Sequence, residues 1–334
     1  MKLGLGVGPM GPPGGERIIE LAKEAENLGY DTIWCPEIYG MDCFTPLSWI
    51  GAHTSKIKLG TSIMQISART PASAAMHAIA IDHLSNGRLI LGIGVSGPQV
   101  VEGWYGQPYP KPLARTREWI EIFRKIIARE EPVSFDGKHY QLPLDGGTGL
   151  GKPLKLMQHP LRDHIPVYLG AEGPKNVALS AELFDGWIPM FLSPYRMHEQ
   201  YADAMAIKGA DFEIAAAVPV VIDDDVDKAR AQVKQNVGFY IGGMGAKTFN
   251  VHKDHVSRMG FADAANEVQD LFMAGKRDQA FAAVPDQLVD EIALCGPKER
   301  IKERLQGWKD SPVTQLNIGS ANTDTLRFFA EELL

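Results

Sequence analysis

The sequence predicts an α/β protein that folds as a (β/α)8 TIM barrel. Buried strand-like segments alternate with helical segments along the chain, eight such strands can be placed, and 334 residues suffice for one large barrel. An open, doubly wound sheet also uses buried parallel strands and is the alternative architecture. We expect a single domain over residues 1–334, with insertions at about 130–165 and 225–308.

Four strand–helix units are expected in the first half of the chain. Gly29 ends the first helix, whose apolar residues recur on one face, and Pro46 and Pro71 stand in the first turns of the next two helices. The expected strands lie at 3–7, 31–37, 58–64 and 88–97, and the expected helices at 15–28, 45–54, 71–87 and 113–129.

The second half begins with the first insertion, where "FDGKHY" predicts a hairpin turn. The alternation then resumes, and a mostly helical insertion is expected after the seventh strand. The remaining strands are expected at 165–170, 185–191, 212–222 and 313–319, with helices from 174, from about 194 and over 323–334.

Composition argues against several classes of protein. The net charge of −7 disfavours nucleic acid and anionic membranes as partners, because both require a basic surface. No apolar run approaches the roughly 20 residues of a membrane span, and the N-terminus lacks the apolar core of a signal peptide. Three scattered cysteines predict neither a disulfide framework nor a zinc site, so we expect a reducing, cytoplasmic location.

Two glycine-rich segments match the dinucleotide-binding pattern G-x-G-x-x-G, namely "GVGPMG" at 6–11 and "GIGVSG" at 92–97. The first is followed by Pro12, Pro13, Gly14 and Gly15 instead of opening a helix directly. We therefore interpret both as small residues at strand ends, where loops or ligands approach closely.

The third strand has an unusual end. "LGTSIMQISARTP" (59–71) begins with apolar residues but continues with Gln65, Ser67 and Arg69 before Pro71 starts a helix. A second notable segment is "YLGAEGPKN" (168–176), where a strand, a small-residue turn and a helix follow one another. Backbone N–H groups at such a helix start can bind an anion, although an ordinary strand–helix turn has the same pattern.

These segments, together with "GRLILGIGVSGPQVVEGWYG" and "KPLARTREWIEIFRKI", resemble the bacterial luciferase-like oxidoreductases, and most closely their coenzyme F420-dependent branch. The resemblance covers essentially the whole chain. It implies a barrel, a cofactor at the carboxyl ends of the strands, and hydride transfer between the deazaflavin C5 and a small organic substrate. An F420-dependent dehydrogenase or reductase is therefore our leading hypothesis.

The resemblance also implies cofactor-binding positions. A non-prolyl cis peptide, in a bulge that backs the cofactor ring, falls at Ser62–Ile63. The phosphate pocket falls on the turn already identified as an anion site. The residues expected to bind the cofactor are Ser62, Ile63, Met64, Gln65, Ser67, Ser96, Gly97, Gln99, Gly170, Ala171, Glu172 and Gly173.

The sequence departs from relatives that oxidise sugar phosphates. Their Asp-His pair after strand two and their Glu after strand four correspond to Glu37, Ile38 and Pro98 here. Glu37 is the acid retained near that position, so it is the candidate catalytic residue, with a salt bridge to Arg69 as the structural alternative.

Further residues are candidates for cavity walls or ligands. Trp104 and Tyr105, in the loop after strand four, are equally consistent with packing and with contact to a flat cofactor. Trp187 and Met190 are expected mainly in the core. "VHKDH" (251–255) lacks a third ligand at a clear spacing, so no metal site is expected.

Two alternative functions remain open. One is an FMN-dependent monooxygenase of the same fold, and the other is a cofactor-free barrel that serves as a binding subunit. A homodimer or a higher homo-oligomer is expected from the resemblance, through the second and third helices, where "SAAMHAIAID" offers small and apolar residues.

Overall fold

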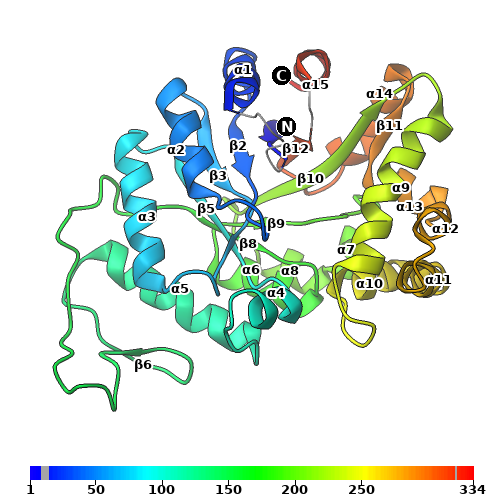
Figure 1. Cartoon of the computed structure of the whole chain (residues 1–334). Coiled ribbons are helices and arrows are strands. Elements are labelled where there is room, and N and C mark those ends of the chain that lie inside the picture. Colours follow the sequence, from blue (N-terminus) through cyan, green and yellow to red (C-terminus); the bar gives the residue numbers. More distant parts are fainter. Residues whose placement is uncertain (9–14, 320–321) are drawn as a thin grey trace.

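The computed structural model describes residues 1–8, 15–319 and 322–334, and it shows a closed parallel barrel surrounded by helices (Figure 1). Each strand pairs in parallel with the next, and the last pairs with the first, so the predicted barrel is confirmed. In order around the barrel the strands are β1 (Lys2–Gly6), β2 (Thr32–Cys35), β3 (Lys58–Thr61) with its continuation β4 (Met64–Gln65), β5 (Leu89–Gly94), β8 (Val167–Gly170), β9 (Gly186–Ile188), β10 (Glu213–Ile222) and β12 (Gln315–Gly319).

Helices cover the outside of the barrel, as their apolar faces predict. In α3, for example, the Thr70 hydroxyl accepts a hydrogen bond from Ser73 N at 3.2 Å and Pro71 occupies the first turn. The covering helices are α1 (Gly15–Asn27), α2 (Phe44–His53), α3 (Pro71–Leu84), α5 (Pro112–Ala128), α6 (Pro174–Leu183), α7 (Met197–Gln200), α8 (Ala202–Ile207), α14 (Lys298–Lys309) and α15 (Thr323–Leu333).

Alternation along each strand separates the two faces of the barrel wall. On β1, Leu3 and Leu5 belong to the large core between barrel and helices, while Gly4 lies against side chains of the barrel interior. Trp34 occupies much of that interior, since a β-carbon placed on Gly60 would lie 2.3 Å from its ring. Small residues on neighbouring strands therefore make room for one large indole.

The first insertion runs from α5 to β8 and contains the predicted hairpin, formed by β6 (Phe135–Asp136) and β7 (Gln141–Leu142). The Glu118 carboxylate of α5 fixes its turn by accepting hydrogen bonds from the backbone N–H groups of Lys138, His139 and Tyr140 at 2.7 to 3.0 Å.

The second insertion has its own apolar cluster, in which Val233, Val237 and Ile241 of α9 pack with Leu288 of α13. Its helical elements are α9 (Val226–Gly243), α10 (Val251–Val256), the π-helical turn η1 (Ser257–Phe261), α11 (Ala262–Met273), α12 (Arg277–Ala282) and α13 (Asp286–Ile292).

Two short elements were not predicted. A strand, β11 (Leu294–Gly296), interrupts the expected helical stretch and pairs with the end of β10 outside the barrel. A short helix, α4 (Pro98–Gly103), occupies part of the expected loop after β5. Elements of three to six residues are too short to establish a hydrophobic period.

Candidate functional site

The end of the third strand contains the cis peptide that the resemblance implies, between Ser62 and Ile63. β3 pairs with β5 at Gly60–Ile90, and β4 resumes the pairing at Met64–Ile93, so this strand carries one extra residue relative to β5. One extra residue in a ladder defines a β-bulge. The predicted bulge is therefore confirmed.

Glycines on two neighbouring strands make room for the Ile63 side chain. A β-carbon on Gly94 would lie 1.8 Å from Ile63 Cδ1, and one on Gly170 would lie 2.9 Å from Ile63 Cγ2. Ile63 packs against an interior cluster that includes Trp34 and Tyr168. The bulge thus turns an apolar side chain into the barrel. Met64, by contrast, is fully buried in the outer core, on the helix side of the wall.

Glu37, at the end of β2, is tied to the residues that follow the bulge. Its carboxylate oxygens lie 2.7 and 2.8 Å from Arg69 Nη1, and one of them accepts a hydrogen bond from Gln65 N at 3.0 Å. The Gln65 side-chain amide donates to Glu37 O at 3.0 Å. Glu37 is only 5 % exposed, so this is a buried ion pair, as the structural alternative predicted. Ser67, in the following turn, is half-buried.

A cavity of about 500 Å³ opens at the carboxyl ends of the strands. Its lining comes from the ends of β1 and β2, from the bulge through Ser62, from the segment after β9, from β10 and β12, and from α9 of the second insertion. Active sites of this architecture form at this end of the barrel. The lining residues are Gly6, Val7, Gly8, Trp34, Pro36, Ser62, Met190, Phe191, Ala217, Val218, Pro219, Asn236, Tyr240, Asn317 and Gly319.

Most of the residues that line this cavity were not predicted from the sequence. Met190 lines the cavity rather than the core, whereas Trp187 is in the core and donates to Ala171 O at 2.8 Å. Asn317 could have been found, because it alternates with buried apolar residues along a strand and so faces the interior. Phe191 and Tyr240 come together only through the tertiary fold.

The predicted anion-binding turn, Gly170–Gly173, leads into α6 as expected. Gly173 stands at the helix start, followed by Pro174, and no side chain caps this end. Glu172 turns away from it and places Oε1 2.7 Å from His252 Nδ1 of α10. The Tyr201 hydroxyl donates to Glu172 O at 3.1 Å.

The Glu172–His252 contact is an ion pair. Burial alone raises the pKa of Glu172, but His252, with His255 and Arg258 nearby, holds that pKa below its usual value. Burial lowers the pKa of His252, yet Glu172 raises it above its usual value overall. The histidines of "VHKDH" thus serve a hydrogen-bonded network, and no cluster of three or more metal-ligating side chains occurs among the described residues.

The loop after β5 also reaches the second insertion. Ser96 has a positive φ of 58°, Gly97 precedes α4, and Gln99 Nε2 lies 3.4 Å from Phe249 O. The predicted residues therefore gather in two groups, one around the bulge and Glu37 and one around the β5 and β8 loops. Of the first glycine motif, residues 9–11 lie outside the described part of the chain.

Comparison with known proteins connects this geometry to a family. Residues 3–315 match the family model of luciferase-like monooxygenases. A candidate coenzyme F420-dependent oxidoreductase of Mycobacterium tuberculosis is 48 % identical over 99 % of this chain and 98 % of its own length. A 5,10-methylenetetrahydromethanopterin reductase of Archaeoglobus fulgidus is 30 % identical over 89 % of this chain and 87 % of its own.

Solved structures show the same fold. The coenzyme F420-dependent tetrahydromethanopterin reductase of Methanopyrus kandleri has a TM-score of 0.76 at 22 % identity, covering 99 % of this chain and 97 % of that one. An F420-dependent secondary alcohol dehydrogenase also has a TM-score of 0.76, at 18 % identity, covering 99 % and 98 %. The barrel, the bulge and the match over nearly the whole sequence lead to one conclusion: this chain belongs to the luciferase-like monooxygenase family.

Proposed function

We propose that the protein is an F420-dependent oxidoreductase that transfers a hydride between the deazaflavin C5 and a small organic substrate. The observation that carries the proposal is the β-bulge between β3 and β4, whose Ser62 lines the cavity at the carboxyl ends of the strands. The 48 % identical relative, a candidate F420-dependent oxidoreductase by name, supports this cofactor.

The residues in and after the bulge suit such a cofactor. Gln65 Oε1 is buried without a hydrogen-bond partner, so it offers a free acceptor beside the bulge. We propose that Ser62, Ile63, Gln65, Ser67 and the backbone of Met64 support the ring. When bound, F420 supplies a carbon that accepts or donates a hydride, and the protein supplies orientation and exclusion of water.

The acidic tail of the cofactor requires a second group of residues. The uncapped start of α6 presents backbone N–H groups, and anions bind favourably at such an end. We propose that Gly170, Ala171, Glu172 and Gly173 hold the phosphate through their backbone. We propose that Ser96, Gly97 and Gln99, in the loop after β5, also contact the cofactor.

We propose Glu37 as the group that holds or moves a proton in the reaction. Glu37 lies just beyond the end of β2 and directly follows Pro36, which lines the cavity. The Glu37→Gln substitution keeps the size of the side chain but removes its charge. We expect kcat to fall at least about tenfold, while the Kd for F420 stays within about threefold. An unchanged kcat would contradict this role.

The cofactor proposal is tested by titration. We expect quenching of F420 fluorescence with a Kd in the low micromolar range or tighter, and FMN binding at least about tenfold weaker. Tight FMN binding without F420 binding would instead support a monooxygenase, in line with the structural similarity to an FMN-bound Baeyer–Villiger monooxygenase (TM-score 0.68, 18 % identity). Failure to bind either cofactor would support the cofactor-free binding subunit.

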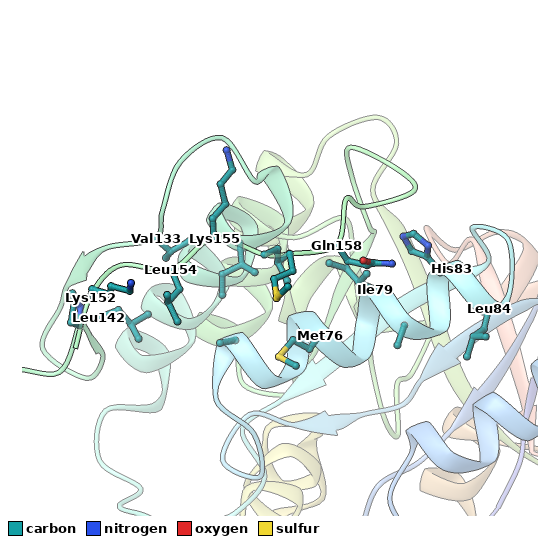
Figure 2. Close-up of a pocket in the computed structure, with 16 residues that line it drawn as sticks. Met76, Ile79, His83, Leu84, Val133, Leu142, Lys152, Leu154, Lys155 and Gln158 are labelled. Atoms are coloured by element: carbon teal, nitrogen blue, oxygen red, sulfur yellow. The ribbon is translucent and has the colours of Figure 1, made fainter. Parts of the chain in front are cut away.

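We further propose that the chain forms one barrel domain and assembles as a homodimer. A second, larger cavity of about 820 Å³ lies on the outside of the barrel, between α3 and the first insertion (Figure 2). Met76 and Leu84 of α3 and Leu154 and Met157 of the insertion are 63 to 94 % exposed. An apolar surface of this kind marks an interaction site, and a second copy of the chain is the partner that we propose for it.

A further inference from the structure

The cavity at the carboxyl ends of the strands carries no charge. None of its described lining residues is acidic or basic. Its hydrogen-bonding side chains are the amides of Asn236 and Asn317, the hydroxyls of Ser62 and Tyr240, and the Trp34 indole. A charged group that entered would lose its hydration without gaining a counter-charge, which is costly in a low-dielectric site. The cavity therefore favours an uncharged ligand.

Exposed apolar side chains border the same end of the barrel. We call Ile38, Tyr39, Met41 and Trp104 the aromatic rim; they are 38, 47, 41 and 66 % exposed. Three of them belong to the loop after β2, and Trp104 follows α4. The rings of Tyr39 and Trp104 lie 6.5 Å apart between centroids, so the two loops meet. Exposed apolar patches that border a cavity are typical of ligand-binding surfaces.

The aromatic rim is continuous with the wall of the cavity. The Tyr39 hydroxyl lies 3.6 Å from Met244 Sδ, just beyond the end of α9. One turn earlier on α9, Tyr240 lines the cavity and packs edge-on against Phe191, another lining residue, with centroids 5.4 Å apart. Ile38 is two residues after Pro36, which also lines the cavity. One apolar surface therefore runs from the solvent into the barrel.

We propose that the substrate is an uncharged, largely apolar molecule whose reacting oxygen function enters the cavity while its apolar body lies on the aromatic rim. This inference rests on the proposed F420-dependent activity and specifies its substrate class. The Asn236 amide and the Tyr240 hydroxyl can donate to a carbonyl or alcohol oxygen, whereas the Asn317 amide already donates to Ala215 O at 3.1 Å. Burial, with Glu172 and Tyr39 nearby, raises the pKa of Tyr240, so its hydroxyl remains protonated as a donor.

The test uses matched neutral and charged congeners. 2-Alkanols from three to ten carbons are assayed with oxidised F420, and the corresponding 2-alkanones and enones with reduced F420. Each alkanol or ketone is paired with its ω-carboxylate. We expect kcat/KM to rise at least about tenfold along the neutral series and to fall at least tenfold on carboxylation. A flat series, or faster turnover of the carboxylates or of a sugar phosphate, would overturn the inference.

Two variants test whether the aromatic rim causes the preference for longer substrates. Trp104→Ala and Tyr39→Ala should lower kcat/KM at least about fivefold for the longest substrate, yet leave the three-carbon substrate and the Kd for F420 within about twofold. Ile207→Ala is the control, since Ile207 is 54 % exposed at the end of α8, just before the amino end of β10. Rim variants that behave like the control would contradict the assignment.

A binding measurement separates this inference from the cofactor proposal. Calorimetric titration of the cofactor-free protein with 2-octanone and with its ω-carboxylate should show binding of the ketone alone, weakened in Trp104→Ala. If the ketone binds but F420 does not, the proposed cofactor is wrong and the substrate class stands. If F420 binds but the ketone does not, the substrate class is wrong.

Discussion

Ile63 and the glycines around it show how single residues shape the site. The bulge brings Ile63 into the barrel, and the absence of side chains at Gly94 and Gly170 gives it space. Because protein interiors are close-packed, one added methyl group here has no place to go unless a neighbour moves.

Gly94→Ala tests this packing. The new β-carbon would meet Ile63 Cδ1 at 1.8 Å, so we expect the free energy of unfolding to fall by about 1–3 kcal/mol and F420 binding to weaken. Ile63→Val removes that Cδ1 atom and leaves the nearest remaining contact, Cγ1, at 3.1 Å. The Gly94→Ala/Ile63→Val double variant should therefore recover much of the loss in urea unfolding.

Ile63→Val alone supplies the control, with an expected cost of about 0.5–1.5 kcal/mol. The two single costs should not add, because the residues are in direct contact. Strictly additive costs would show that Ile63 does not occupy the space over Gly94.

At the scale of elements, the second insertion is joined to the barrel by the turn after β8. Glu172 belongs to that turn, His252 belongs to α10, and their side chains are 11 and 16 % exposed. Tyr201 and His255 extend the network, with the Tyr201 oxygen 3.3 Å from His255 Nδ1. The turn proposed to hold the phosphate is thus fixed from the side by the insertion.

The pH dependence of stability reports on this pair. The pKa of Glu172 is lowered from 4.5, so its contribution is complete above pH 4.5 and is lost as the pH falls through the lowered value. The pKa of His252 is raised from 6.5, so its contribution is complete below pH 6.5 and is lost as the pH rises through the raised value. The pair should therefore stabilise most between about pH 4.5 and 6.5.

Substitution of His252 isolates this contribution. We expect His252→Gln to lower the free energy of unfolding by about 3 kcal/mol at pH 6, and by less at pH 9. Taking the difference between the two proteins at each pH removes the effects of His255 and other titrating groups. A difference that is constant with pH in urea unfolding would disprove the ion pair.

Elements differ in how far the sequence predicts them. The eight strands and the main helices follow from local hydrophobic patterns. The bulge after β3 was predicted only because the segment at 59–71 resembles the corresponding segment of the luciferase-like family. Phe191 and Tyr240 wall the cavity from segments about 50 residues apart, and no local pattern relates them. The Glu172–His252 pair joins residues 80 positions apart, and each is an ordinary polar residue in its own segment.

At the scale of the molecule, α3 carries an exposed apolar stripe on its outer face, beside the exposed His77 and His83. Ala72, Met76, Ala80 and Leu84 are exposed on the side away from the barrel, while Ala75, Ala78 and Ile79 are buried on the other. An exposed apolar stripe of this kind is typical of a surface that another molecule covers. Two-fold symmetry would bring α3 of one copy against α3 of the other, as in the commonest class of homo-oligomer.

Met76→Glu tests the proposed dimer. A carboxylate at this position would be buried without a partner in the interface, so we expect the dissociation constant to rise at least about 30-fold, equivalent to about 2 kcal/mol. Sedimentation velocity at micromolar concentration should show a dimer for the unaltered protein and a monomer for the variant. Ile207→Glu, a matched charge on an exposed apolar residue of α8, should leave the dimer intact. A monomeric unaltered protein, or a Met76→Glu variant that remains dimeric, would mean that this surface does not bind a second copy.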